Sequence, residues 1–230
     1  MLDLIRSTSF LSKLESLHLP RSSDPLSMNS SPKFKWPVTL RELHISGGLR
    51  DSAAPYFRKL PPTLSYLSIR NCSNLTIEFI QPLIKTLGPQ LHSLDILAPL
   101  PHVHHWPTPP LDLVLDLVPN LTHLKISVDL ISIRFFEGPS PTSLTRLDLH
   151  CHDRSNCQYI EPLMVYNALG TDAFAKVRIV GVHYKLQWDT RLYLQDLMDL
   201  EELLIALARE DEAGAGIPEA EAGVKRLTGP

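Results

Sequence analysis

One short pattern recurs along most of the chain: an apolar residue, two others, an apolar residue, one other and a third apolar residue. In LPPTLSYLSIRNC (60–72) the three apolar positions are Leu64, Leu67 and Ile69. Full copies begin at Leu14, Leu40, Leu64, Leu91, Leu121 and Leu144, and a weaker copy is Phe174-Val177-Ile179. Their first positions are 26, 24, 27, 30, 23 and 30 residues apart. A repeat of this length predicts stacked units that share one continuous core.

Each copy predicts a turn that leads into a short strand. Side chains two residues apart lie on the same face of a strand, so Leu67 and Ile69 are expected to point into the core. Leu64 anchors the turn, and a proline before several copies keeps the approach extended. No unit can bury its apolar face alone, so the strands are expected to stack into a parallel sheet. Segments such as 77–88 and 159–170 are expected to form short helices between strands.

The pattern resembles the leucine-rich repeat family over residues 11–182, as about seven irregular repeats. Cys72, three residues after Ile69, is similar to the cysteine of the subtype found in many F-box leucine-rich proteins, of fungal type. This resemblance implies an α/β leucine-rich repeat solenoid, with a curved parallel sheet on its concave side and short helices and loops on its convex side. The F-box that precedes the repeats in that family is not recognisable in this sequence.

The ends of the chain differ from the repeats. Residues 1–10 are expected to form a partial N-terminal cap. Residues 183–211 are expected to form a C-terminal capping helix, because apolar residues recur there at intervals of four and three. Residues 212–230 are rich in Gly, Ala and Glu, and we expect them to be disordered.

The composition argues against several classes of partner. The 230 residues carry a formal net charge of -3, which disfavours nucleic acid as a partner, and no apolar run is long enough to cross a membrane. The N-terminus does not resemble a signal peptide. The chain has three cysteines, which favours reduced thiols over a disulfide framework. We therefore expect an intracellular protein, cytoplasmic or nuclear.

Motifs for catalysis are lacking, so we expect no enzyme activity and no cofactor. The segment HCHDRSNC (150–157) offers metal-ligand residue types at a spacing unlike that of known zinc sites. A metal-dependent enzyme that uses this segment is an alternative. His102, His104 and His105 gather in a proline-rich loop, which we interpret as exposed rather than metal-binding.

Candidate binding residues flank the inward-pointing residues of each strand, where the concave surface faces solvent. They are Glu42, His44, Tyr66, Ser68, Arg70, Asp95, His123, Lys125, Arg146, Asp148, His150 and Arg178. Tyr and Arg are residue types that often dominate the binding energy at protein interfaces. We therefore expect a non-enzymatic module that binds a protein partner, and the resemblance implies a substrate-receptor role in a ubiquitin ligase system. A self-associating structural solenoid, paired through its N-terminal edge, is a further alternative.

Overall fold

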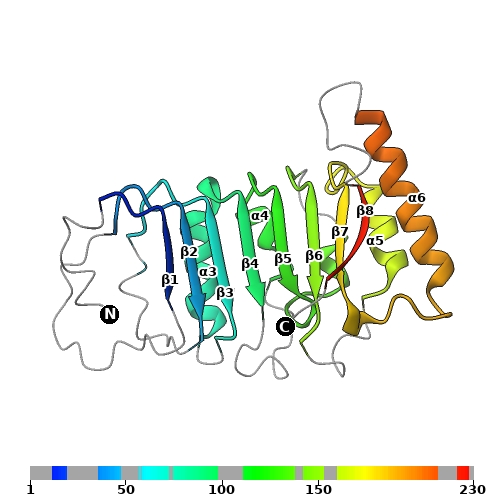
Figure 1. Cartoon of the computed structure of the whole chain (residues 1–230), viewed down its shortest axis with the longest axis horizontal. Helices are drawn as coiled ribbons and strands as arrows, with labels where there is room; N and C mark the ends of the chain where they lie inside the picture. The colour runs from blue at the N-terminus through cyan, green and yellow to red at the C-terminus, as the bar shows by residue number, and fades with distance from the viewer. Residues whose placement is uncertain are drawn as a thin grey trace.

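The computed structural model describes residues 12–19, 36–47, 57, 59–72, 75–97, 111–137, 142–152, 160–211 and 222–227. These residues form an α/β structure around one parallel sheet of eight strands. The strands lie side by side in the order in which they occur in the sequence (Figure 1). The sheet does not close on itself, and this solenoid-like α/β arrangement is the one that the repeat predicts.

The elements alternate along the chain. The strands are β1 (Ser16–Leu19), β2 (Glu42–Ser46), β3 (Tyr66–Arg70), β4 (Ser93–Leu97), β5 (His123–Ser127), β6 (Arg146–His150), β7 (Ile179–His183) and β8 (Gly223–Leu227). The α-helices are α3 (Ile77–Leu87), α4 (Val114–Leu117), α5 (Pro162–Leu169) and α6 (Leu194–Asp211). Short 3-10 helices are η2 (Gly88–Gln90), η4 (Val128–Leu130), η5 (Ile133–Phe135) and η7 (Tyr184–Leu186).

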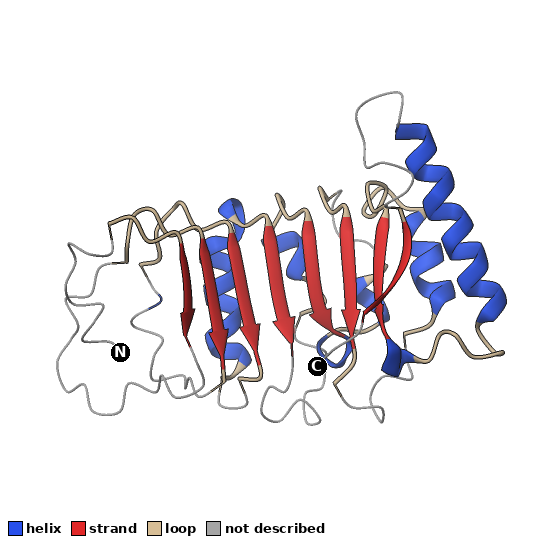
Figure 2. Ribbon diagram, in the orientation of Figure 1, coloured by secondary structure: helices blue, strands red, loops and turns tan. Residues whose placement is uncertain are grey.

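The core lies between the sheet and the helices that cover one of its faces (Figure 2). Leu67 on β3 pairs in register with Leu43 on β2 and Leu94 on β4, and all three side chains are fully buried. On α3 the residues Ile80 and Ile84, one helical turn apart, are also fully buried. Burial of each such side chain contributes roughly 2 kcal/mol relative to exposure. The first six apolar triads therefore act as predicted, because each supplies one layer of a shared core.

Threonine hydroxyls connect neighbouring repeats just before the strands. Thr63 donates a hydrogen bond to the carbonyl oxygen of Leu40 at 2.8 Å, and Thr39 donates to that of Leu14 at 2.9 Å. Further along the sheet, just before β6, Thr145 donates to the carbonyl oxygen of Thr122 at 3.0 Å. These bonds satisfy backbone acceptors where the chain turns into each strand, and so help to fix the stacking distance between repeats.

Cys72 lies below the turn that leaves β3. The residue before it, Asn71, has a φ of 53°, which turns the chain sharply at this point. The Cys72 side chain is fully buried, and its sulfur lies 3.2 Å from the carbonyl oxygen of Arg70. Burial raises the pKa of this thiol to about 11, so Cys72 is an unreactive packing residue.

The seventh repeat lies three residues further along the chain than predicted. Strand β7 pairs Val180 with Leu147 and Val182 with Leu149, so the core-facing triad is Val177-Val180-Val182. The predicted triad Phe174-Val177-Ile179 is therefore wrong. The predicted position of Arg178 on the solvent-facing surface is wrong for the same reason. This residue lies just before β7 and is buried.

The C-terminal part of the chain also differs from the prediction. We expect disorder over residues 212–230, but residues 223–227 form β8, which extends the sheet beyond β7 in parallel register. Helix α6 packs against both α5 and β8, and its Leu200 and Leu204 are fully buried. Among the described residues, no helix is both long and apolar enough to cross a bilayer. Residues 1–10 lie outside the described part of the chain.

Candidate binding face

The candidate functional surface is the face of the sheet opposite α3, α4 and α5, which we call the open face. It carries three rows of residues, with one residue from each of the eight strands in the first two rows and one from each of β2 to β8 in the third. The first row is Ser16, Glu42, Tyr66, Ser93, His123, Arg146, Ile179 and Gly223. The middle row is His18, His44, Ser68, Asp95, Lys125, Asp148, Gly181 and Lys225. The third row includes Ser46, Arg70, Leu97, Ser127, His150, His183 and Leu227.

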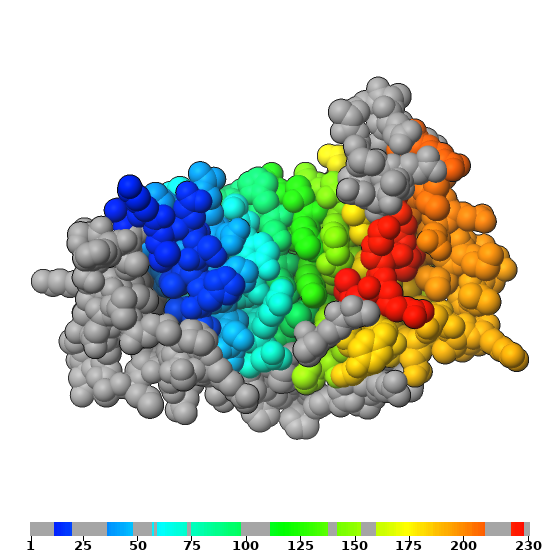
Figure 3. All heavy atoms as spheres, viewed as in Figure 1, coloured from blue at the N-terminus to red at the C-terminus, as the bar shows by residue number. Residues whose placement is uncertain are grey.

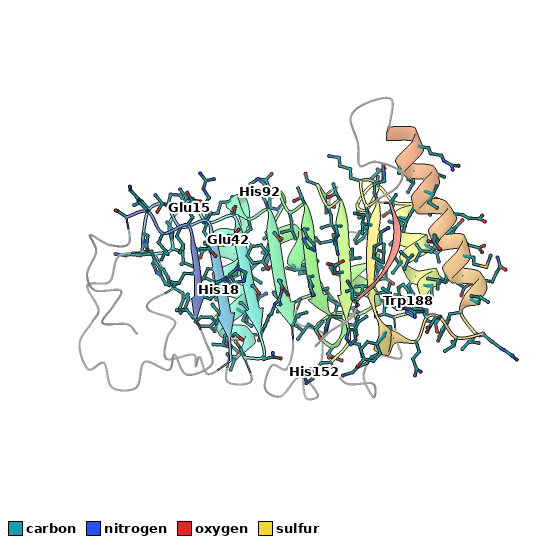
Figure 4. All side chains as sticks on the ribbon, viewed as in Figure 1. Glu15, His18, Glu42, His92, His152 and Trp188 are labelled. Atoms are coloured by element: carbon teal, nitrogen blue, oxygen red, sulfur yellow. The ribbon has the colours of Figure 1, made fainter. Side chains whose placement is uncertain are left out.

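The predicted site residues fall into two groups on this face, with Arg178 excluded. Partly or fully exposed are Glu42, His44, Tyr66, Arg70, His123, Lys125 and Arg146. Buried beneath neighbouring side chains are Ser68, Asp95, Asp148 and His150. Figure 3 shows the described strands of this face in chain order, and Figure 4 labels His18 and Glu42 near its β1 end. The open face is therefore a layered polar surface, with buried groups that hold the exposed ones.

The Asp95 carboxylate on β4 holds an arginine from β3. Nε of Arg70 donates to Oδ2 of Asp95 at 2.7 Å, and Nη2 of Arg70 also contacts this oxygen. The Ser68 hydroxyl lies 3.3 Å from Oδ2 as well. The Asp95 side chain is 3% exposed, whereas the Arg70 side chain is 41% exposed. The negative charge is thus hidden and the positive charge faces solvent.

A second carboxylate, Asp148 on β6, holds two groups from the first row. Nε of Arg146 lies 3.0 Å from Oδ1 of Asp148, and Nε2 of His123 lies 2.9 Å from Oδ2. Burial by itself would raise the pKa of Asp148, but the hydrogen bonds and positive charge of these two neighbours lower it below its ordinary value. Asp148 is 3% exposed, and His123 and Arg146 are each 37% exposed.

Gly181 on β7 leaves space for this carboxylate. A Cβ atom at position 181 would lie 2.0 Å from Oδ1 of Asp148, which is far inside van der Waals contact. Gly181 itself was not among the predicted site residues, because only the register of β7 against β6 shows that it faces Asp148.

Aromatic rings cover the β1–β3 end of the open face. The imidazoles of His18 and His44 stack with centroids 3.8 Å apart, and His44 lies 4.8 Å from the Tyr66 ring. Burial lowers the pKa of His44, and the neighbouring charge of His18 lowers it further. The His44 ring is therefore neutral near neutral pH.

A second group of rings lies at the end of β6 and β7. His150 and His183 have centroids 4.0 Å apart, and His183 lies 4.5 Å from Tyr184. Burial lowers the pKa of His150 to about 4, with further lowering from the charges of His183 and Lys125. Sequence reasoning missed His183. It placed the seventh repeat three residues too early in the chain, so a different residue was assigned to the third row of that strand.

The residues considered for metal binding do not form a site in the part of the chain that the structure describes. No group of three or more His, Cys, Asp or Glu side chains is arranged there to hold a metal ion. The loop histidines His102, His104 and His105, like Cys157, lie outside the described residues. Cys151 is buried and disulfide-bonded, which differs from the reduced thiol that the cysteine count favours.

Comparison with known proteins adds one relative. No family model matches the chain. Protein pof5 of Schizosaccharomyces pombe (strain 972 / ATCC 24843) is 30% identical over 202 residues, which cover 84% of this chain and 54% of pof5. The chain spans about half the length of that relative. The similarity extends over most of the repeats described above and is not confined to one of them.

Proposed function

We propose that this chain is a leucine-rich repeat solenoid that acts as a non-enzymatic protein-binding module through its open face. The single observation that carries the proposal is the layering of that face. Asp95 and Asp148 are buried and charged, and each of them holds a partly exposed arginine in a fixed position.

Compared with an apolar pair of similar volume, a buried carboxylate that supports a surface arginine adds little net stability to a fold. The cost of removing both charges from water offsets most of their attraction. Pre-organised side chains do, however, lower the entropy lost when a partner binds, and arginine and tyrosine frequently dominate binding energy. These properties support Arg70, Arg146 and Tyr66 as the proposed anchors for a protein partner.

A direct test compares two double variants in affinity capture from cell lysate. Tyr66→Ala with Lys125→Glu changes the open face but leaves both arginine–aspartate pairs intact. Tyr166→Ala with Lys85→Glu makes the same changes at exposed positions of α5 and α3, on the helix-covered side. We expect captured proteins to be lost with the first variant and retained with the second, when both show wild-type circular dichroism.

Retention of the same proteins by both variants would contradict the proposal. Size measurement across a range of concentrations would then test one of the alternatives, a solenoid that associates with itself. The resemblance to F-box leucine-rich proteins extends the proposal to the substrate-binding part of a ubiquitin ligase. Ligase subunits among the captured proteins would support that extension.

A further inference from the structure

The exposed charge at the centre of the open face is of one sign. On strands β3 to β6, the ionised side chains of the three rows are Arg70, Lys125 and Arg146, which are positive, and Asp95 and Asp148, which are negative. Both carboxylates are 3% exposed, whereas the side chains of Arg70 and Arg146 are 41% and 37% exposed. Lys125 is also partly exposed. A partner that approaches this region therefore meets positive charge, although the whole chain carries a net charge of -3.

Acidic side chains border this region but do not cover it. Glu42 is exposed on β2, on one side. After β5, Asp129 lies 3.2 Å from the Ser127 hydroxyl, at the turn that leaves the strand. At the β8 end, the Glu201 side chain approaches Gly223. We call the basic area on β3–β6 the basic diagonal, defined by Arg70, Lys125 and Arg146; the exposed Lys225 on β8 is separated from it by Gly181 on β7.

These three residues cross the open face obliquely. Arg70 lies in the third row of β3, Lys125 in the middle row of β5 and Arg146 in the first row of β6. With strands about 4.8 Å apart and a rise of about 3.3 Å per residue, the backbone positions of Arg70 and Arg146 are separated by roughly 20 Å. Lys125 lies close to the line between them. About six residues of extended peptide cover this distance, with every second side chain directed at the sheet.

We infer that the open face binds an extended acidic peptide segment, in which alternate carboxylates pair with Arg70, Lys125 and Arg146. This inference rests on the proposed function and adds the chemistry of the partner. Both contacts of Arg146 to Asp148 are made by Nε, so its terminal nitrogens point beyond that pair. An arginine fork of this kind suits a carboxylate, with which it forms two parallel hydrogen bonds. His123 lies beside Arg146 and adds positive charge when it is protonated.

The inference is tested with purified full chain and fluorescein-labelled peptides of about twelve residues, read by fluorescence anisotropy. The peptides alternate serine with Glu, Gln or Lys, so that they differ only in charge. We expect the Glu peptide to bind at least about tenfold more tightly than the Gln peptide, and the Lys peptide not to bind. Raising the salt from about 0.05 to 0.3 M should weaken binding, because the Debye length shortens below the spacing of the charges.

Lys125→Gln is the informative variant, because no described contact holds the lysine and the arginine pairs remain intact. We expect it to weaken binding of the Glu peptide about three- to tenfold. Lys85→Gln on α3 makes the same substitution on the helix-covered side and should leave binding unchanged. Equal binding of the Glu and Gln peptides, or no effect of Lys125→Gln, would overturn the inference.

Two further outcomes separate this inference from the proposed function. If lysate capture depends on the open face but the Glu peptide does not bind up to millimolar concentration, the acidic partner is wrong and the binding module stands. If a single-stranded DNA oligonucleotide of equal charge binds more tightly than the Glu peptide, the basic diagonal recognises phosphate, and the inference fails.

Discussion

The two ends of the open face fill equivalent positions with different chemistry. In the middle row, β1 and β2 present the stacked imidazoles of His18 and His44, whereas β6 presents the buried carboxylate of Asp148. The rings contact each other and remain partly open to water. The carboxylate is 3% exposed and depends on His123 and Arg146 for its hydrogen bonds. The same backbone therefore supports one region that tolerates change and another in which each group depends on its partners.

The largest difference between these regions is expected on removal of the carboxylate. Asp148→Ala leaves Arg146 and His123 without their acceptor and opens space beside Gly181, so we expect the free energy of unfolding to fall by about 2–4 kcal/mol. His18→Ala, in the same row at the β1 end, should cost less than about 1 kcal/mol because that ring is exposed. Urea unfolding of both variants measures the difference. Equal losses would show that the two ends do not differ in this way.

A smaller but more specific effect is expected at Gly181. A Cβ atom there would lie 2.0 Å from Oδ1 of Asp148, so Gly181→Ala must displace the carboxylate from its partners, at a cost of about 1–3 kcal/mol. Combining it with Asp148→Ala should cost clearly less than the sum of the two single changes, because the clash no longer exists. Gly170→Ala, whose Cβ would lie 3.4 Å from the nearest atom, is the matched control. Additive losses would refute the contact.

The sequence predicts the sheet better than it predicts the charged layer on it. The triads place β1 to β6 because residues such as Leu67 and Ile69 are apolar at every copy, and their burial fixes the register. The seventh repeat is ambiguous, since both Phe174-Val177-Ile179 and Val177-Val180-Val182 match the pattern. Only pairing with β6 selects the second of these.

Strand β8 and the buried carboxylates could not be predicted for related reasons. Strand β8 has Arg226 where other strands have a buried apolar residue, so GVKRL (223–227) carries no triad. The pairing of Arg70 with Asp95 joins different rows of neighbouring strands, and a row-by-row reading of the sequence does not reveal it. Local patterns identify strands, whereas contacts between strands depend on a register that local patterns do not contain.

A pH-dependent difference is expected at the β6–β7 end. The pKa of His150 is about 4 in the folded chain and about 6.5 in an unfolded one. As the pH falls from about 6.5 to 4, the unfolded state therefore binds a proton that the folded state excludes, and stability decreases by on the order of 1–2 kcal/mol. Above pH 6.5 this group has no effect.

Chemical unfolding at pH 7.5 and at pH 5 measures this decrease, and His150→Gln should remove it. The lowered pKa of Asp148 affects a separate window, because its contribution is present above the ordinary carboxyl pKa of about 3.9 and is lost only below it. An unchanged pH dependence in His150→Gln would mean that another group is responsible.

The smallest expected effect lies at the β1–β3 end, and it is a change in titration more than in stability. His18→Ala removes a neighbouring positive charge and should raise the pKa of His44 toward its ordinary value, although burial of His44 keeps part of the lowering. NMR titration of the imidazole signals measures this shift, and His92→Ala, away from the stack, is the control. No change in His44 would mean that burial alone sets its pKa. A clear shift with little loss of stability would show that the rings act on each other locally, whereas the removal of Asp148 acts on the fold.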